Sequence, residues 1–426
     1  MAGHEPGDVF VTGLGVTTAI GQGVREFTAG LLEGRSNFSV MRRPGRQCAL
    51  AGGVAAGVGG LDGRVSTAFI GAEIGELALT ASIQKSPALR TASLSGRVAL
   101  LTLQEAWSDA RLEGIDPARI GLVVGGSNFQ QRELVVSQES FRSRPQFLRP
   151  SYGMSFMDSD VCGLCTEHFG IRGFAYTIGG ASASGQLAAI HGVQAVLSGQ
   201  VDVCVVVGAL MDLSYWECQG LRAIGAMGSD RYSNDPARAC RPFDRDRDGF
   251  IYGECCGVLI IEGSARVKRD GVRPYARLAG WSVRMDANRN PNPSLEGEVG
   301  AIRGALEHAG WSAGRIDYIN PHGTGSMVGD ETELRAIREC GLSRAHLNAT
   351  KSLTGHGLTA AGAVEIIATL VQMSQKKLHP TLNLQHAMEP GYEWVGVEGA
   401  DHVIRNALSL SFGFGGVNTA VCLERV

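Results

Sequence analysis

The chain has 426 residues, a formal net charge of −3 and 19% charged residues, so it has no surplus of basic side chains to neutralise a nucleic-acid backbone. With 44% hydrophobic residues and no run approaching about 18 uninterrupted apolar residues, the composition indicates a globular protein with a sizeable core and argues against a membrane span. Ten cysteines at scattered spacings, behind a polar start unlike a secretory signal, favour a reducing cytoplasm.

Apolar strand-like runs alternate with helical segments along the chain. We expect strands at 9–16, 120–124, 201–208, 258–262, 318–320, 408–411 and 419–423, and helices at 97–110, 184–197, 299–309, 331–340 and 361–372. This alternation predicts an α/β layered fold. Runs such as VCVVVGA and GVLIIEG are apolar on both faces, which favours largely parallel strands covered by helices on each side. The Gly-, Ala- and Ser-rich stretch 34–96 is expected to form loops and short helices.

The segment from Phe174 to Gly199 contains the first candidate site. A short strand leads into Gly179 and Gly180, and an alanine-rich helix leaves from about Ser182. A side chain there lies at a helix N-terminus, where free N–H groups and the dipole favour developing negative charge. A serine in this position can equally be a helix cap. The hydrolase pattern G-x-S-x-G is absent, so the segment by itself leaves both interpretations open.

Three later segments add histidines, a lysine and a glycine-dense turn. His322 follows Pro321 at the carboxyl end of an expected strand, where α/β folds place ligand sites. Lys351 and His356 precede a helix that carries Glu365, and the glycine-dense SFGFGGVN turn joins the two C-terminal strands. A lone histidine is usually structural, but two histidines in such positions, each next to glycine, indicate a functional site.

Five blocks occur in a familiar order: GGASASG, RPFDRDRDGFIYGECCGVLIIE, PHGTGSMVGD, TKSLTGHGLTAAGAVE and SFGFGGVNTA. In order and spacing they resemble the signature blocks of the β-ketoacyl-acyl-carrier-protein synthases, and the resemblance spans essentially the whole chain. It implies the thiolase fold, a five-layered αβαβα arrangement with two duplicated mixed-sheet halves, which dimerises. The expected halves are 1–264, with Ser182, and 265–426, with His322, Lys351, His356 and Phe414.

The resemblance also assigns roles to individual residues. The nucleophile position falls on Ser182, where condensing members of the family carry cysteine. The catalytic histidines fall on His322 and His356, the supporting lysine on Lys351, and its glutamate partner on Glu365. Their chemistry needs no metal and no resident cofactor, because the substrate arrives on the phosphopantetheine arm of an acyl carrier protein.

The glycine-dense turn carries the remaining implied roles. Its gating phenylalanine falls on Phe414, whose N–H would form an oxyanion hole with the N–H of Ser182. Substrate contacts are expected at Thr324, Phe412 and Gly415.

Serine at the nucleophile position changes the expected reaction. A cysteine at a helix N-terminus can become a thiolate at neutral pH, whereas serine needs an adjacent general base. An oxyester on Ser182 would also be a poorer acyl donor than a thioester. Decarboxylation needs only donors that stabilise an enolate, and His322 and His356 are both present. We therefore expect a free-standing malonyl-acyl-carrier-protein decarboxylase.

This expectation matches the serine-containing ketosynthase homologues of polyketide β-branching cassettes, which share the GGASASG appearance. Their partners would be an acyl carrier protein and proteins resembling hydroxymethylglutaryl-CoA synthase and enoyl-CoA hydratase, with a homodimeric enzyme in the cytoplasm and no nucleic acid or membrane. Two alternatives stay open: an acyltransferase or condensing enzyme with a serine nucleophile, and a non-catalytic partner subunit of a ketosynthase heterodimer. Such partner subunits commonly lose the histidines as well, and this chain keeps both.

Other motifs are interpreted as structural. The loop from Asp244 to Gly249 imitates a calcium-binding loop, but its twelfth position is Cys255 instead of glutamate. Cys162 and Cys165 form a lone C-x-x-C without a second pair. His191 is expected on the surface or at an interface.

Overall fold

The computed structural model describes residues 7–48, 67–270 and 272–426, and its strands fall into two halves with the same order. The N-terminal half contains β1 (Val9–Thr18), β5 (Ile120–Gly125), β6 (Phe174–Ile178), β7 (Val203–Gly208) and β9 (Cys255–Gly263), in the spatial order β6-β5-β7-β9-β1. The C-terminal half repeats this order as β12-β11-β16-β17-β10, with β10 (Ala276–Met285), β11 (Tyr318–Asn320), β12 (His346–Leu347), β16 (Asn406–Gly413) and β17 (Val417–Arg425). The chain is therefore a structural duplication, which the sequence does not reveal as a repeat.

Each half is a mixed sheet, as the family resemblance implies, which corrects the prediction of largely parallel strands from the hydrophobic pattern. β5 pairs in parallel with β6 and β7, whereas β9 is antiparallel to both of its neighbours, β7 and β1. The C-terminal half has the same directions, with β17 as its antiparallel strand. The prediction failed because a strand covered on both faces is apolar whichever way it runs, so hydrophobic content does not reveal strand direction. A short ladder between β1 and β10 joins the halves.

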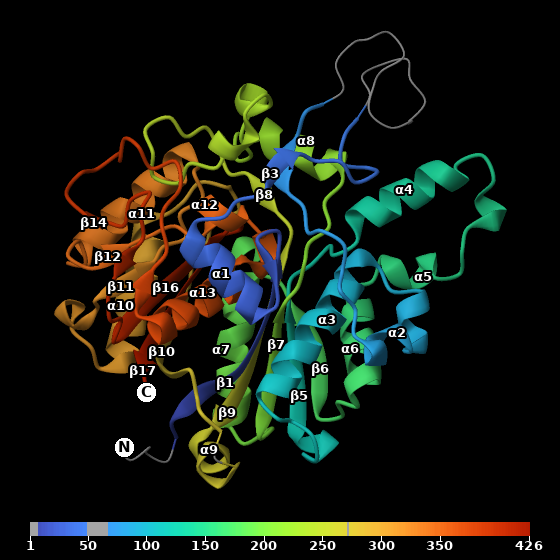
Figure 1. Ribbon diagram of the computed structural model, residues 1–426, viewed down its shortest axis with the longest axis horizontal. Coiled ribbons are helices and arrows are strands. Elements are labelled where there is room, and N and C mark those ends of the chain that lie inside the picture. The colour runs from blue at the N-terminus through green and yellow to red at the C-terminus, as the bar shows by residue number, and fades with distance from the viewer. Residues whose placement is uncertain (1–6, 49–66, 271) are drawn as a thin grey trace.

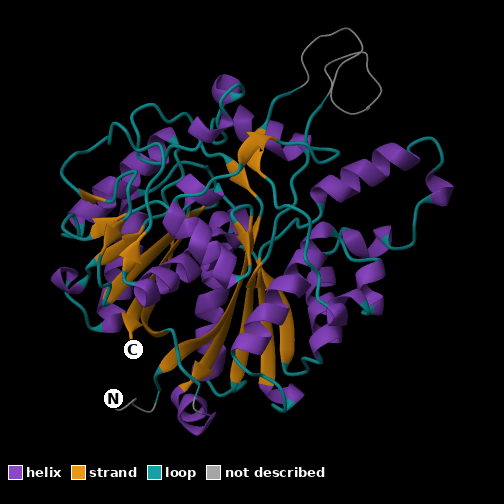
Figure 2. Ribbon diagram, viewed as in Figure 1, coloured by secondary structure: helices purple, strands orange, loops and turns teal. Residues whose placement is uncertain are grey.

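Helices cover both sheets and fill the space between them, giving five layers (Figures 1 and 2). On the outside, α3 (Leu94–Asp109) and α6 (Ser159–Phe169) pack on the N-terminal sheet. On the C-terminal sheet lies α10 (Leu295–Ala309), with α11 (Met327–Glu339) packed against it. Between the sheets lie α7 (Ser184–Leu197) and α13 (Ala361–Gln375). The expected five-layered α/β fold is thus confirmed.

Glycine allows the two central helices to approach closely. A Cβ on Gly185 of α7 would lie 2.8 Å from the backbone nitrogen of Ala363, and one on Gly362 of α13 would lie 2.8 Å from that of Gln186. Every residue of α13 from Ala361 to Met373 is buried, as expected for a helix that is apolar on all sides. This contact fixes where the N-terminal ends of α7 and α13 lie, and those ends carry the candidate site.

The remaining elements lie mostly around this frame. They are β2 (Gly21–Gln22), α1 (Val24–Glu33), α2 (Ala81–Gln84), α4 (Gln131–Phe141), α5 (Tyr152–Ser155), α8 (Tyr215–Ala223), α9 (Ser264–Asp270), α12 (Lys351–Thr354), β13 (Lys377–Leu378), β14 (Glu393–Trp394) and β15 (Ala400–Asp401). Within 34–96, two short strands, β3 (Phe38–Val40) and β4 (Ile70–Ala72), pair with each other and extend to β8 (Tyr252–Gly253), contrary to the expectation of loops and short helices alone. Residues 49–66 of that stretch lie outside the described part. Among the residues described, no helix is both long and apolar enough to cross a membrane.

Candidate active site

Ser182 lies in a tight turn between β6 and α7. Ala181 precedes it with a φ of 46°, a left-handed conformation that is uncommon for a residue other than glycine. A short 3₁₀ turn over Ala181–Ala183 leads into α7. The turn is closed by Ser184, whose Oγ donates to the carbonyl of Ala181 at 2.7 Å and accepts from the N–H of Gly180 at 2.8 Å. Ser184 is therefore the structural serine, and the Ser182 hydroxyl is left to point elsewhere.

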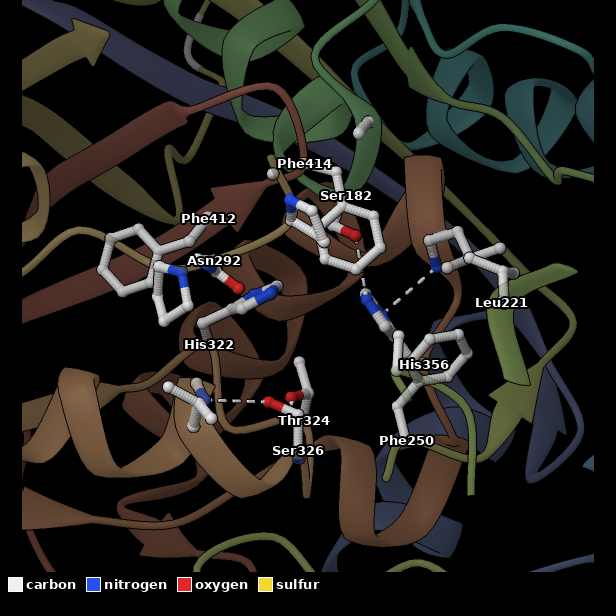
Figure 3. A pocket seen from close by; sticks show the side chains of 18 of the residues that line it. Ser182, Leu221, Phe250, Asn292, His322, Thr324, Ser326, His356, Phe412 and Phe414 are labelled. Atoms are coloured by element: carbon white, nitrogen blue, oxygen red, sulfur yellow. Dashed lines mark hydrogen bonds between the residues drawn. The ribbon is translucent and has the colours of Figure 1, made fainter. Parts of the chain in front are cut away.

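The Ser182 hydroxyl contacts His356. Its Oγ lies 3.0 Å from Nε2 of His356 (Figure 3). On the other side of the ring, the backbone N–H of Leu358 donates to Nδ1 of His356 at 3.3 Å. Because Nδ1 accepts a hydrogen bond, the proton of the neutral ring lies on Nε2, and Nε2 donates to Ser182. Burial and the nearby charge of Lys351 hold the pKa of His356 well below its ordinary value, so the ring is neutral.

Lys351 fixes the second histidine. Its Nζ lies 3.4 Å from Nδ1 of His322 and also donates to the backbone carbonyl of His322 and to the carboxylate of Glu365. These three acceptors match the three N–H groups of an ammonium. With Nδ1 of His322 accepting, its proton lies on Nε2, as in His356. Burial, with smaller contributions from Lys351 and His356, holds the pKa of His322 well below its ordinary value.

The two imidazoles form a pair. Their ring centroids are 5.4 Å apart, with an interplanar angle of 82°. The ring of Phe250 packs edge-on against His356 at 5.0 Å, and that of Phe412 packs against His322 at 5.7 Å. These aromatic rings restrict how the imidazoles can turn, so both keep their Nε2 donors in fixed directions.

Two buried carboxyl groups hold the loop of His322, and sequence reasoning did not single them out. Glu333 accepts from the N–H groups of His322 and Gly323 at 2.6 and 2.8 Å. Asp330 accepts from the N–H groups of Thr324 and Gly325 at 3.1 and 3.0 Å. Burial raises the pKa of Glu333 to about 8. The D-x-x-E spacing on α11 was the available signal, because residues three apart share one helix face.

The glycine-dense turn between β16 and β17 comes close to Ser182. A Cβ on Gly413 would lie 2.1 Å from the carbonyl oxygen of Gly180, so only glycine fits there. Phe414 is 40% exposed at the edge of the cavity, which suits a residue that moves. Gly415 has a φ of 86°, and its neighbours Gly413 and Gly416 line the cavity. The substrate contacts assigned to Thr324, Phe412 and Gly415 stay predictions.

These groups share one cavity of about 370 Å³. Ser182, His322 and His356 line it together with residues from both halves of the chain, and Figure 3 shows their side chains facing the same space. Met327 and Val328 line the same cavity and are more than half exposed, giving it an apolar border. Lys351 and Glu365 lie behind His322 and are buried. The structure thus brings the five predicted catalytic residues together, while their roles remain to be tested.

The other motifs are built into the fold. Asp244 accepts hydrogen bonds from the N–H groups of Gln385 and His386 and pairs with Arg241 at 3.0 Å, so its carboxylate holds a turn. Cys162 and Cys165 are buried, and burial raises the pKa of both thiols. In the described part of the chain, no cluster of three or more His, Cys, Asp or Glu side chains has an arrangement suited to a metal ion.

Comparison with known proteins identifies the family. The chain matches the N-terminal domain of β-ketoacyl synthases over residues 7–266 and their C-terminal domain over residues 275–385. The predicted boundary between residues 264 and 265 stays a prediction.

One relative matches nearly the whole chain at more than half of the aligned positions. The polyketide biosynthesis malonyl-ACP decarboxylase PksF of Bacillus subtilis is 57% identical over 419 residues, which cover 98% of this chain and 97% of PksF. A crystal structure of a β-ketoacyl synthase from Burkholderia phymatum has a TM-score of 0.85 at 25% identity and covers 98% of this chain and 99% of its own. A ketosynthase solved in complex with a type II PKS acyl-carrier protein (AntDE:AntF) has a TM-score of 0.84 at 25% identity, covering 99% and 100% of the two chains. The chain is a thiolase-fold protein and belongs to the β-ketoacyl synthase family.

Proposed function

We propose that this protein is a malonyl-acyl-carrier-protein decarboxylase, which converts malonyl-carrier protein to acetyl-carrier protein and carbon dioxide. The observation that carries the proposal is that the N–H of Leu358 donates to Nδ1 of His356, which leaves Nε2 as the donor toward Ser182. The relative that matches nearly the whole chain, PksF, is named for the same reaction in polyketide biosynthesis.

The two histidines provide the chemistry. When the bond between the malonyl carboxylate and Cα breaks, its electron pair moves toward the thioester carbonyl, and negative charge develops on that oxygen. The Nε2–H groups of His322 and His356 are the donors that stabilise this enolate oxygen. They are set before the reaction begins, because Lys351 and the N–H of Leu358 hold the other ring nitrogens, so little reorganisation is needed. A proton then adds to Cα and gives the acetyl group.

The same geometry leaves Ser182 without a general base. A serine nucleophile needs a neighbour that accepts its proton. The neighbour at 3.0 Å is His356, and its Nε2 already carries a proton. Acylation of Ser182 therefore lacks its first step, whereas decarboxylation keeps both of its donors. This weighs against the alternative of an acyltransferase or condensing enzyme, and the retained histidines weigh against a non-catalytic partner subunit.

We extend the proposal to the partners of the enzyme. The carrier protein supplies the malonyl group on its phosphopantetheine arm, and the acetyl product serves a partner resembling hydroxymethylglutaryl-CoA synthase, followed by one resembling enoyl-CoA hydratase, in polyketide β-branching in the cytoplasm. Homodimerisation is supported by β6, which ends the N-terminal sheet and exposes 39% of Tyr176. An unpaired strand at a sheet edge is a natural site for a second copy.

The decisive experiment incubates the protein with malonyl-carrier protein and follows the loss of carbon dioxide by mass spectrometry of the carrier. Acetyl-carrier protein should form without any added acyl acceptor. His322→Ala should reduce its formation strongly, and intact-protein spectra should show no acyl adduct on Ser182. Undiminished decarboxylation by His322→Ala would refute the mechanism, and an adduct on Ser182 during turnover would favour the serine-nucleophile alternative.

A further inference from the structure

A carboxyl group that the mechanism above does not use lines the same cavity. Glu298 lies in the first turns of α10, its side chain is 1% exposed, and it borders the space that Ser182, His322 and His356 also line. Its Oε2 atom is buried and has no hydrogen-bond partner within the part of the chain that the structure describes. A buried carboxyl oxygen without a partner is costly, so its presence beside a reaction chamber calls for a functional explanation.

The surroundings of Glu298 are acidic. Burial raises the pKa of Glu298 well above its ordinary value, and the acidic groups of Glu333, Asp286 and Asp330, which line the same cavity, add to this shift. Arg247 lies 3.8 Å from the carboxylate of Asp330 and donates to the backbone carbonyls of Ser326 and Met327, so its charge acts on Asp330. The raised pKa favours the protonated form of Glu298, which has a proton to give.

We propose that Glu298 supplies the proton that quenches the enolate, an inference that rests on the proposed decarboxylation. Carbon dioxide leaves, the enolate electron pair at Cα takes the proton of the Glu298 carboxyl, and acetyl-carrier protein and a Glu298 carboxylate result. The carboxylate regains a proton from water entering through the cavity mouth, so neither an oxidant nor a co-reactant is consumed. A buried acid in the cavity that the histidine pair also lines lets protonation compete with recapture of carbon dioxide, which an enzyme whose product is acetyl requires.

The test measures how the enolate partitions. Enzyme and malonyl-carrier protein are incubated in buffer containing ¹³C-labelled bicarbonate, and mass spectrometry gives the ratio of label returned to the malonyl group to acetyl formed. Glu298→Gln keeps the size of the side chain but removes its acidic proton, so the ratio should rise at least about tenfold, since a positioned acid typically contributes about 10²-fold or more. Glu296→Gln, an exposed position on the same helix, is the matched control and should leave the ratio unchanged.

The outcomes separate this inference from the proposed function. If the unaltered protein forms no acetyl-carrier protein, the proposed function fails. If acetyl-carrier protein does form, an unchanged ratio of returned label to acetyl in Glu298→Gln overturns the proposed role of Glu298. This holds even when KM rises, because a rise in KM alone means that the side chain only binds the malonyl group. Glu298→Met is measured in parallel, with thermal unfolding of both variants, so that a folded protein lacking the acid is available. A raised ratio in either folded variant supports the inference.

Discussion

The loops that lead into the two central helices have the same backbone course but serve different purposes. Before α7, Ala181 has a φ of 46° and begins the 3₁₀ turn Ala181–Ala183. Before α13, Leu358 has a φ of 50° and begins the 3₁₀ turn Leu358–Ala360. Since the two halves also share a strand order, Ser182 and Thr359 occupy equivalent positions, and both carry a hydroxyl.

The partners of those hydroxyls differ. Thr359 is fully buried and donates to the backbone carbonyl of Ala209 at 2.8 Å, so its hydroxyl holds two segments of the core together. The Ser182 hydroxyl accepts a hydrogen bond from His356. His356 belongs to the loop before α13, where it lies two residues before Leu358, just as Gly179 lies two residues before Ala181. A helix N-terminus with a hydroxyl is thus used for packing in one half and faces the proposed active site in the other. The side chain that meets the hydroxyl, more than the turn itself, decides the difference.

Removing that side chain should have the largest effect. His356→Ala deletes one of the two donors proposed to stabilise the enolate, and we expect decarboxylation to fall about 10²- to 10³-fold, the usual cost of losing one such donor. The rate is followed by formation of acetyl-carrier protein. His191→Ala, a half-buried histidine on α7, is the control and should keep its rate. If His356→Ala reacts within a few-fold of the rate of the unaltered protein, His356 is not an enolate donor, and its contact with Ser182 does not mark the reaction site.

Lys351→Met should have the next largest effect. His322 loses the donor that keeps its proton on Nε2, and we expect a loss of about 10- to 100-fold, as is found for residues that orient a metal-binding histidine. The charge of Lys351 is one cause of the depressed pKa of His322, so removing it should raise that pKa. The imidazole then protonates at a higher pH as acid is added, which an NMR titration of His322 detects. An unchanged titration with a reduced rate would show that Lys351 acts only through stability.

Exchanging Ser182 should change the products more than the rate. In Ser182→Cys the thiol can ionise without a base beside it, so an acyl adduct should appear in intact-protein mass spectra after incubation with acyl-carrier protein. Decarboxylation by Ser182→Cys and by Ser182→Ala should stay within about tenfold of the unaltered protein, because both variants keep the Nε2–H groups of His322 and His356. A large loss in Ser182→Ala would assign the hydroxyl a direct part in breaking the C–C bond.

How much of this site could be predicted depends on the kind of signal. Ser182, His322 and His356 lie in short blocks rich in glycine, and their residue types and neighbours are visible along the chain. The helices that carry them were also foreseen: α7 has the expected bounds, and α13 begins at the expected Ala361 and ends three residues later, at Gln375. These are local patterns, which a sequence states directly.

What the sequence could not state is how distant segments meet. The two halves share a strand order without a readable sequence repeat. What they have in common is which strands are buried and how the strands are connected, and different residues can satisfy both. The proton positions on the imidazoles depend on Lys351 and on the N–H of Leu358, and only three-dimensional contact shows those hydrogen bonds. Glu298 lies in an ordinary amphipathic helix, and nothing in its neighbours along the chain marks it as buried in a cavity.

The smallest expected effect tests the comparison of the hydroxyls most directly. Thr359→Val keeps the shape of the side chain but takes the donor from the buried carbonyl of Ala209, which should lower the free energy of unfolding by about 1–3 kcal/mol. Ser182→Ala should lower it by less, because the Nε2–H of His356 faces a cavity that water can enter. Thr369→Val serves as the control, since the carbonyl of Glu365 that its hydroxyl contacts also accepts a helical N–H. Chemical denaturation of the three variants measures the differences, and a larger loss in Ser182→Ala than in Thr359→Val would reverse the roles assigned to the two loops.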